Sequence, residues 1–236
     1  MQDVISDFNE RVTEVAQFLK VLERLESPGV VLYDKTTRRQ KRVFQEGSLK
    51  VMKATVFLLI YNVVESSIRS AFGHLYGEIA MASMTGNDLR AELRKIWIKQ
   101  QFQGLDEDSA SVRTFRELTE RLVEEIVDGK TVNLEGRLLP VSGNLDADSI
   151  RQVCKKHGVV VSVHKNASGG VEMKTVKDQR NALAHGNSSF SDCGKQYTVT
   201  DLKRINSQAV IFVRGILRNV QKYTGKKQYV GKVASN

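Results

Sequence analysis

The residues best suited to chemistry lie close together in the last quarter of the chain, in the run Arg180 to Gly186 (RNALAHG). A histidine has an unperturbed pKa near ~6.5, so His185 can accept or donate a proton near neutral pH. Arg180 presents a planar fork of donors that matches phosphate oxygens and stays charged. Cleavage of RNA through its 2′-hydroxyl needs a base, an acid and cations for the charge that builds on phosphorus. Arg180 and His185 are therefore candidate catalytic residues, and Asn181 is a candidate supporting residue.

The spacing within this run indicates that one chain is not enough. On a helix with ~100° per residue, Arg180 and His185 lie ~140° apart, so their side chains flank a face rather than touch. Asn181 and His185 are four residues apart and share a face, which lets Asn181 orient the imidazole or bind a phosphate oxygen. One histidine cannot easily be base and acid in the same transfer. A two-fold dimer would supply two histidines and two arginines, so we expect a homodimer.

Each of these residues also has a purely structural interpretation. His185 could be a helix cap that interacts with the helix dipole, and Arg180 could be the ion-pair partner of Glu65. Glu65 is a further candidate site residue, because it could orient Arg180; the alternative is a plain helical ion pair with Arg69, four residues later. Tyr197 follows the motif and could lie near the cleft or simply pack.

Composition restricts the class of protein. The chain has 236 residues, 41% hydrophobic and 27% charged, which is typical of a globular domain and excludes a disordered, collagenous or disulfide-stapled chain. The two cysteines, Cys154 and Cys193, are too few for a zinc site of their own, and we expect no metal and no cofactor. The N-terminus does not resemble a signal peptide, and the longest apolar stretch, 54–64, is shorter than the ~20 residues that span a bilayer. We therefore expect a soluble cytoplasmic protein with no membrane partner.

The formal net charge of +9 suggests an anionic partner, most often nucleic acid, although a charge spread over the surface would only aid solubility. Basic residues concentrate between Lys35 and Lys53 and after Arg218, whereas the segment from Asp106 to Asp128 is acidic. Both interpretations of the basic stretches stay open at this point.

Hydrophobic periodicity predicts a helical protein. Apolar residues recur at helical spacing in seven segments, and the second is apolar nearly all round, which is typical of a central buried helix. The predicted helices are 4–25, 49–79, 89–97 with Asn87 as cap, 115–126, 148–157 capped by Asp146 or Asp148, 171–185, and a last helix opened by Thr200 or Asp201. A short strand or hairpin is predicted in 130–144 and a strand in 159–163. The region around Gly169 and Gly170 is predicted to be a turn.

The expected architecture is an all-α helical bundle with a small irregular or β insert, forming one domain over 1–236. Within it we distinguish an N-terminal helix and basic linker (1–48), a bundle core (49–224) and a basic tail (225–236). Among the other histidines, His157 precedes a helix-ending glycine and is predicted to be a cation favoured by the helix dipole. His74 is expected to be a packing or surface residue. Phosphate-binding glycine loops and the common metalloprotease, paired-cysteine and serine-hydrolase motifs are absent from the sequence.

The motif Arg180-Asn181-x-x-x-His185-Gly186, on a helix near the end of an α-helical chain, resembles the signature of the HEPN superfamily, a domain shared by higher eukaryotes and prokaryotes. Two further segments are similar to stand-alone prokaryotic HEPN proteins: Leu59–Glu65 (LIYNVVE) on the central helix, and Gly143–Asp146 (GNLD) before the following helix. The resemblance covers about 49–223, and Arg-x4-His is its only sharply defined motif.

The resemblance implies a helical bundle and a metal-independent endoribonuclease, typically a homodimer whose active cleft is built from both subunits. It also implies an RNA substrate, a role as a toxin of a toxin–antitoxin pair or as a phage-defence effector, and a neutralising antitoxin or regulatory partner protein. The alternative within the same family is a non-catalytic module that binds nucleotides, RNA or protein. A DNA-binding regulator ranks last, because no helix-turn-helix stands out in the sequence.

Overall fold

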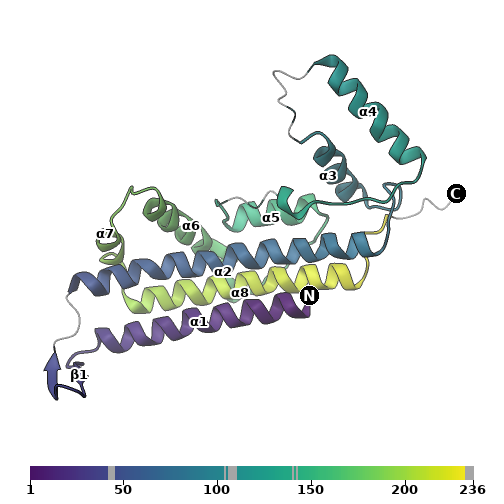
Figure 1. Cartoon of the computed structure of the whole chain (residues 1–236). Helices are drawn as coiled ribbons and strands as arrows, with labels where there is room; N and C mark the ends of the chain where they lie inside the picture. Colours follow the sequence, from purple (N-terminus) through teal and green to yellow (C-terminus); the bar gives the residue numbers. More distant parts are fainter. Residues whose placement is uncertain (42–45, 104, 106–110, 140, 142, 232–236) are drawn as a thin grey trace.

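The computed structural model describes residues 1–236 except 42–45, 104, 106–110, 140, 142 and 232–236. Three long helices form the body of the molecule: α1 (Gln2–Glu26), α2 (Glu46–Met81) and α8 (Val199–Gly225). They lie side by side, and both α1 and α8 pack against α2 (Figure 1). The predicted bundle of long helices is therefore confirmed.

Helix α2 is the centre of the core. It buries residues on every side, among them Phe57, Ile60, Ile68, Phe72 and Leu75, because α1, α6, α7 and α8 all pack against it. A helix that is apolar all round must be covered by neighbours or by lipid. Within the described residues, α2 alone is long and apolar enough to cross a membrane by length and composition, and half of its most apolar window is buried inside the bundle.

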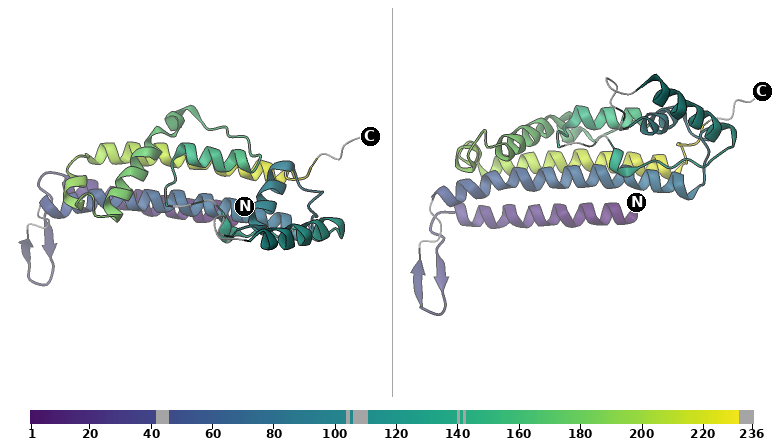
Figure 2. Two further views of the ribbon diagram at one scale, coloured as in Figure 1. Left: turned by 90° about the horizontal axis from the view of Figure 1, so that it is seen from above. Right: turned by 45° about the horizontal axis from the view of Figure 1, so that its top comes forward.

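A layer of shorter helices lies on the side of α2 and α8 away from α1 (Figures 1 and 2). It contains α5 (Ala147–Lys156), the 3₁₀ helix η2 (Lys165–Gly170), α6 (Val171–Ala184) and α7 (Phe190–Gly194). At the far end, α3 (Ala91–Gln101) and α4 (Val112–Val127) form an arm that rises from the bundle (Figure 1). The motif at 180–186 lies on and just after α6 of the layer of shorter helices, and the long helices beneath this layer fix its position.

Most of the helix ends agree with the capping and glycine signals in the sequence. Asp146 caps α5 through a reciprocal capping box with Ser149, and Gly129, Gly158 and Gly186 all adopt positive φ just after a helix, as predicted. Two of the predicted N-cap residues were wrong. Helix α3 begins at Ala91 without a side-chain cap, rather than after Asn87, and the capping residue of α8 is Thr198, two residues before the predicted Thr200. The short helix α7 was not predicted from the sequence.

The strand predictions were wrong in both places. Segment 159–163 is extended but unpaired, and 130–144 holds the 3₁₀ helix η1 (Gly136–Leu138) and a single bridge between Thr131 and Thr85, with Pro140 and Ser142 outside the described residues. Both segments run among helices, which offer no strand edge to pair with, and β-branched residues alone do not make a strand.

The one sheet among the described residues lies instead in the basic linker. Strands β1 (Leu32–Asp34) and β2 (Arg39–Lys41) pair antiparallel, with Tyr33 opposite Gln40. The hairpin projects from the end of the bundle near the start of α2 (Figures 1 and 2). It supplies the small β insert that we expected, but at a different place in the chain.

Candidate functional site

His185 lies at the C-terminal end of α6. The helix ends in a Schellman motif, in which the Asn187 N–H donates to the Ala182 carbonyl (2.9 Å) and Gly186 adopts φ 71°. His185 is the last residue before this turn, and its side chain is exposed. Among the residues that the structure describes, its imidazole has no hydrogen-bond or ion-pair partner. Both ring nitrogens are therefore accessible from outside the chain.

Arg180 lies one and a half turns earlier and is held by uncharged groups. Its Nη1 donates to the Gly143 carbonyl (3.2 Å) and to Oδ1 of Asn181 (2.9 Å). Its guanidinium carbon lies 4.7 Å from the centre of the Tyr61 ring, in a cation–π contact. In the described part of the chain no carboxylate pairs with Arg180. The side chain is therefore fixed in position while its positive charge is not compensated.

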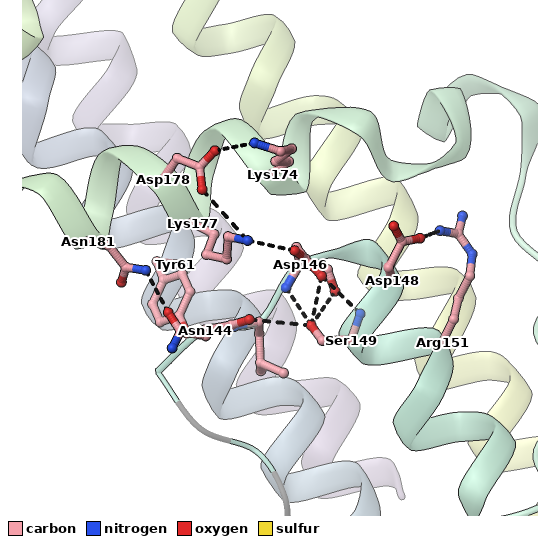
Figure 3. Close-up of polar contacts among 11 residues, drawn as sticks. Tyr61, Asn144, Asp146, Asp148, Ser149, Arg151, Lys174, Lys177, Asp178 and Asn181 are labelled. Atoms are coloured by element: carbon pink, nitrogen blue, oxygen red, sulfur yellow. Dashed lines mark hydrogen bonds and ion pairs between the residues drawn. The ribbon is translucent and has the colours of Figure 1, made fainter.

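Asn181 connects α6 to the GNLD segment. Its Nδ2 donates to Oδ1 of Asn144 (2.6 Å) (Figure 3). Its Oδ1 accepts from Nη1 of Arg180. We had expected Asn181 to orient the imidazole of His185 or to bind phosphate. In this structure its side chain instead positions Arg180, and only its backbone carbonyl, which accepts the N–H of His185 (3.0 Å), reaches the histidine.

Tyr61 is a site residue to which the sequence reasoning gave no role. It is buried on α2, beneath Arg180, and its hydroxyl accepts the backbone N–H of Leu145 (3.1 Å). Burial raises the pKa of Tyr61, whereas the Leu145 hydrogen bond and the positive charge of Arg180 oppose that rise. Tyr61 therefore joins α2 to the GNLD segment and stacks against Arg180. The available signal was a tyrosine in the middle of a mostly apolar helix segment.

The GNLD segment is itself anchored to α6. Asp146, which caps α5, accepts hydrogen bonds from the Ser149 N–H (2.9 Å) and from Nζ of Lys177 (2.7 Å) (Figure 3). Burial would raise the pKa of Asp146, but the Lys177 and Ser149 hydrogen bonds outweigh it and lower that pKa to about 2. Asp146 is thus ionised at neutral pH, and its ion pair holds Gly143 and Asn144 beside Arg180.

A cavity of about 390 Å³ opens between α2 and Arg180. It is lined by Leu58, Tyr61, Asn62, Glu65, Ser66, Arg69 and Arg180. Glu65 accepts from Nη2 of Arg69 (3.1 Å), and the same Nη2 also donates to the Val141 carbonyl (2.8 Å). Glu65 therefore shares the cavity with Arg180, but the ion pair that it forms is the helical pair with Arg69. His185 does not line this cavity.

Of two other residues that we considered, Tyr197 is partly buried against the core and His157 lies within it. Tyr197 contacts Phe57 edge to face, with ring centres 4.7 Å apart. His157 was predicted to be a cation at a helix end, and this prediction was wrong. It is fully buried, its Nδ1 lies 2.7 Å from the Val153 carbonyl, and its Nε2 lies 2.8 Å from the Tyr76 hydroxyl. Burial lowers the pKa of His157 to about 4, so it is neutral at pH 7.

The cysteines and carboxylates do not gather into a metal centre. Cys154 and Cys193 are buried free thiols on different helices, and burial raises the pKa of each, to about 12 and about 11. In the described residues no group of three or more His, Cys, Asp or Glu side chains is arranged to hold a metal ion.

Comparison with protein families agrees with this geometry. A family model described as MAE_28990-like HEPN matches residues 1–229. The chain belongs to the HEPN superfamily. The match includes α1, on which the resemblance seen in the sequence did not depend, and it identifies the helical bundle as an HEPN bundle. No protein of curated function and no solved structure matches this HEPN chain.

Proposed function

We propose that this HEPN protein is a metal-independent endoribonuclease, in which His185 transfers protons and Arg180 stabilises charge on the scissile phosphate. The observation that carries the proposal is the state of Arg180, fixed by a carbonyl, an amide and an aromatic ring, with no carboxylate partner among the described residues. A structural arginine would be expected to hold an acid, as Arg69 holds Glu65. Family membership supports the proposal, because HEPN domains are commonly ribonucleases.

The chemistry divides between two kinds of residue. His185, exposed and without a partner in the described chain, is free to take the proton of the 2′-hydroxyl or to protonate the leaving 5′-oxygen. Arg180 would donate hydrogen bonds to the phosphate oxygens as negative charge builds there. Asn181, Asn144 and Tyr61 act through Arg180 and are positioning residues. A single His185 supplies only one proton-transfer group, so a homodimer with a composite cleft completes the proposed site.

The cellular role is proposed on the same basis. The protein would act on RNA in the cytoplasm, as a toxin or a phage-defence effector, and a neutralising antitoxin or a regulatory partner protein would control it. No membrane partner is proposed.

The test is cleavage of total RNA by the purified protein in excess EDTA. We expect the wild-type protein to cleave and to leave 2′,3′-cyclic phosphate or 3′-phosphate ends, while His185→Ala, still folded and dimeric, does not. His164→Ala is a matched control, because His164 is also exposed and lies at a helix terminus. Equal cleavage by wild type and His185→Ala would remove His185 from the mechanism. Binding of RNA without turnover by the wild type would favour the non-catalytic module.

A further inference from the structure

A second cavity lies away from the site above, between α3, α5 and η1. It is a groove of about 1040 Å³. Its floor is apolar, formed by Ile96, Phe102, Leu105, Leu138 and Leu139. Helices α3 and α5, which form its two walls, lie next to each other above α2 (Figure 1).

The walls of this groove are rich in lysine. Lys95 and Lys99 are four residues apart on α3 and so share one face, and Lys155 and Lys156 lie in the last turn of α5. All four side chains are exposed. Within the described residues, none of the four ammonium groups forms a hydrogen bond or an ion pair. Lys99 of α3 and the two lysines of α5 lie in the last turn of their helices, where the helix dipole stabilises a positive charge, whereas Lys95 does not.

The remaining charges of the groove are compensated locally. Glu92 is the one carboxylate that lines it, and Glu92 pairs with Arg90 (2.9 Å). Arg137 also lines the groove and pairs with Glu135. Among the described residues, the lysines are therefore the groove's cations without an ion pair, two on each wall, although the charge of Lys95 also helps to lower the pKa of Glu92. A positively charged groove with apolar and aromatic surface is the arrangement that holds a single-stranded nucleic acid, with phosphates on the cations and bases on the floor.

Two segments of the chain connect the groove with the candidate site. Residues 137–139 line the groove, and the same segment continues to the Gly143 carbonyl that accepts from Arg180. Helix α5 begins at Asp146, beside α6, and ends at the groove with Lys155 and Lys156. Ten helical residues span about 15 Å, so Lys155 and Lys156 lie about that far along α5 from Asp146, which pairs with Lys177 of α6.

We propose that the groove between α3 and α5 is a second RNA-binding site, which holds single-stranded RNA beside the cleavage site through Lys95, Lys99, Lys155 and Lys156. This inference rests on the proposed ribonuclease function for the nature of the ligand. The groove would add affinity for long RNA without taking part in the chemistry. Short oligonucleotides that fill only the cleavage site would not use it.

The test is RNA binding in a His185→Ala background, so that the RNA is not cut. Fluorescence anisotropy would measure the affinity for a fluorescein-labelled, mixed-sequence 20-nucleotide RNA and for a 6-nucleotide RNA. The double variant Lys99→Glu/Lys155→Glu takes one lysine from each wall. We expect it to weaken binding of the 20-mer about tenfold or more and to reduce the salt slope by about 1.4, since each phosphate contact to a single strand contributes about 0.7. Binding of the 6-mer should change much less.

The matched control is Lys20→Glu/Lys130→Glu, which changes the net charge equally at two exposed lysines outside the groove. Thermal unfolding would verify that both double variants are folded, and Lys95→Glu/Lys156→Glu provides a second groove variant.

An equal loss of RNA affinity in the groove and control variants overturns the inference. No loss of RNA affinity in either also overturns it, and this is the result expected if the groove binds an acidic protein segment instead. If the wild-type protein cleaves RNA while the groove variants bind as the control does, only the second site fails. If wild type does not cleave but the groove variants lose binding, only the proposed cleavage fails.

Discussion

Two histidines of this protein have the same local setting and opposite environments. His157 and His185 each occupy the capping position at the end of a helix, and each is followed by a glycine with positive φ, Gly158 at 74° and Gly186 at 71°. His157 is fully buried and hydrogen-bonded through both ring nitrogens. His185 is exposed, and its ring has no partner in the described chain. Local sequence therefore fixes the end of the helix, whereas the neighbours in space decide what the imidazole can do.

The neighbours explain the difference. Helix α5 ends over the core, where Phe72 and Tyr76 of α2 lie against the His157 ring, at 4.4 and 5.7 Å between ring centres. The Val153 carbonyl can only accept a hydrogen bond, so Nδ1 of His157 carries the proton and Nε2 accepts from Tyr76. Such a histidine is a neutral core residue. Helix α6 ends at the surface, so neither ring nitrogen of His185 has a partner in the described chain.

The largest expected effect is a loss of RNA cleavage on substitution of His185. His185→Gln should reduce RNA cleavage about 10²–10⁴-fold, the usual contribution of a general acid or base. Its unfolding free energy should change by no more than about 0.5 kcal/mol, because the side chain is exposed and forms no hydrogen bond or ion pair in the described chain. Single-turnover cleavage and urea unfolding of the same preparation would measure both. A His185→Gln protein that is strongly destabilised would show that this histidine is structural after all.

The next largest effect is a pH dependence of the unfolding free energy that is caused by His157. Its pKa falls from 6.5 in the unfolded chain to about 4 when folded, because burial disfavours the cation. The unfolded state therefore binds a proton at higher pH than the folded state. The contribution is fully present above about pH 6.5 and is lost as pH falls toward 4, by up to about 3 kcal/mol.

Urea unfolding between pH 7.5 and 4 would measure this loss. His157→Gln cannot titrate and should flatten the curve, whereas His185→Gln should leave the slope as in wild type. The pKa of His74 is also lowered by burial, so the difference between the two variants is the decisive quantity. The carboxyl of Asp146, with a pKa of about 2, titrates below this window. Equal slopes in the two variants would contradict the assignment of His157 as a buried neutral residue.

A smaller effect is expected at the two glycines. Gly186→Ala should cost about 1 kcal/mol through its positive φ alone, because no atom lies within 4 Å of the added Cβ. Gly158→Ala carries the same strain, and its Cβ would also meet Nε of Arg90 at 2.9 Å, so about 1–2 kcal/mol is expected. Thermal unfolding would measure both. Asn tolerates positive φ, so Gly186→Asn should recover most of the loss, and a failure to recover would point to a contact with another chain.

The smallest effect is expected at Glu65. An ion pair between Glu65 and Arg180 would have connected the site to α2, as the hydrogen bond from Tyr76 connects His157 to α2. Glu65 pairs with Arg69 instead, four residues along a half-exposed helix face. Glu65→Gln should therefore change stability by less than about 0.5 kcal/mol and leave cleavage nearly unchanged. Arg69→Gln is the partner control and should behave similarly in stability. A large loss of cleavage in Glu65→Gln alone would restore Glu65 as a residue that acts on Arg180.

The sequence by itself determined the long helices, most of their ends and the residues that could do chemistry. These features follow from hydrophobic spacing, glycines after helices and the chemical nature of arginine and histidine, all of which are local. It did not determine the hairpin at Leu32–Lys41 or the absence of strands at 159–163, because a strand depends on a partner that local sequence does not show. It also did not find Tyr61 and Asn144 as the groups around Arg180.

Only the tertiary structure decided that His157 is a neutral core residue while His185 is exposed. It also decided which acid pairs with which arginine. Glu65 lies within a helical turn of Arg69, but its access to Arg180 depends on where α6 crosses α2. Burial, ring contacts and the partner of each charge arise from elements that are far apart in the chain. The chemistry proposed for His185 and Arg180 can therefore be inferred from the seven residues 180–186. Whether these two side chains are available for it depends on which partners the fold places around them.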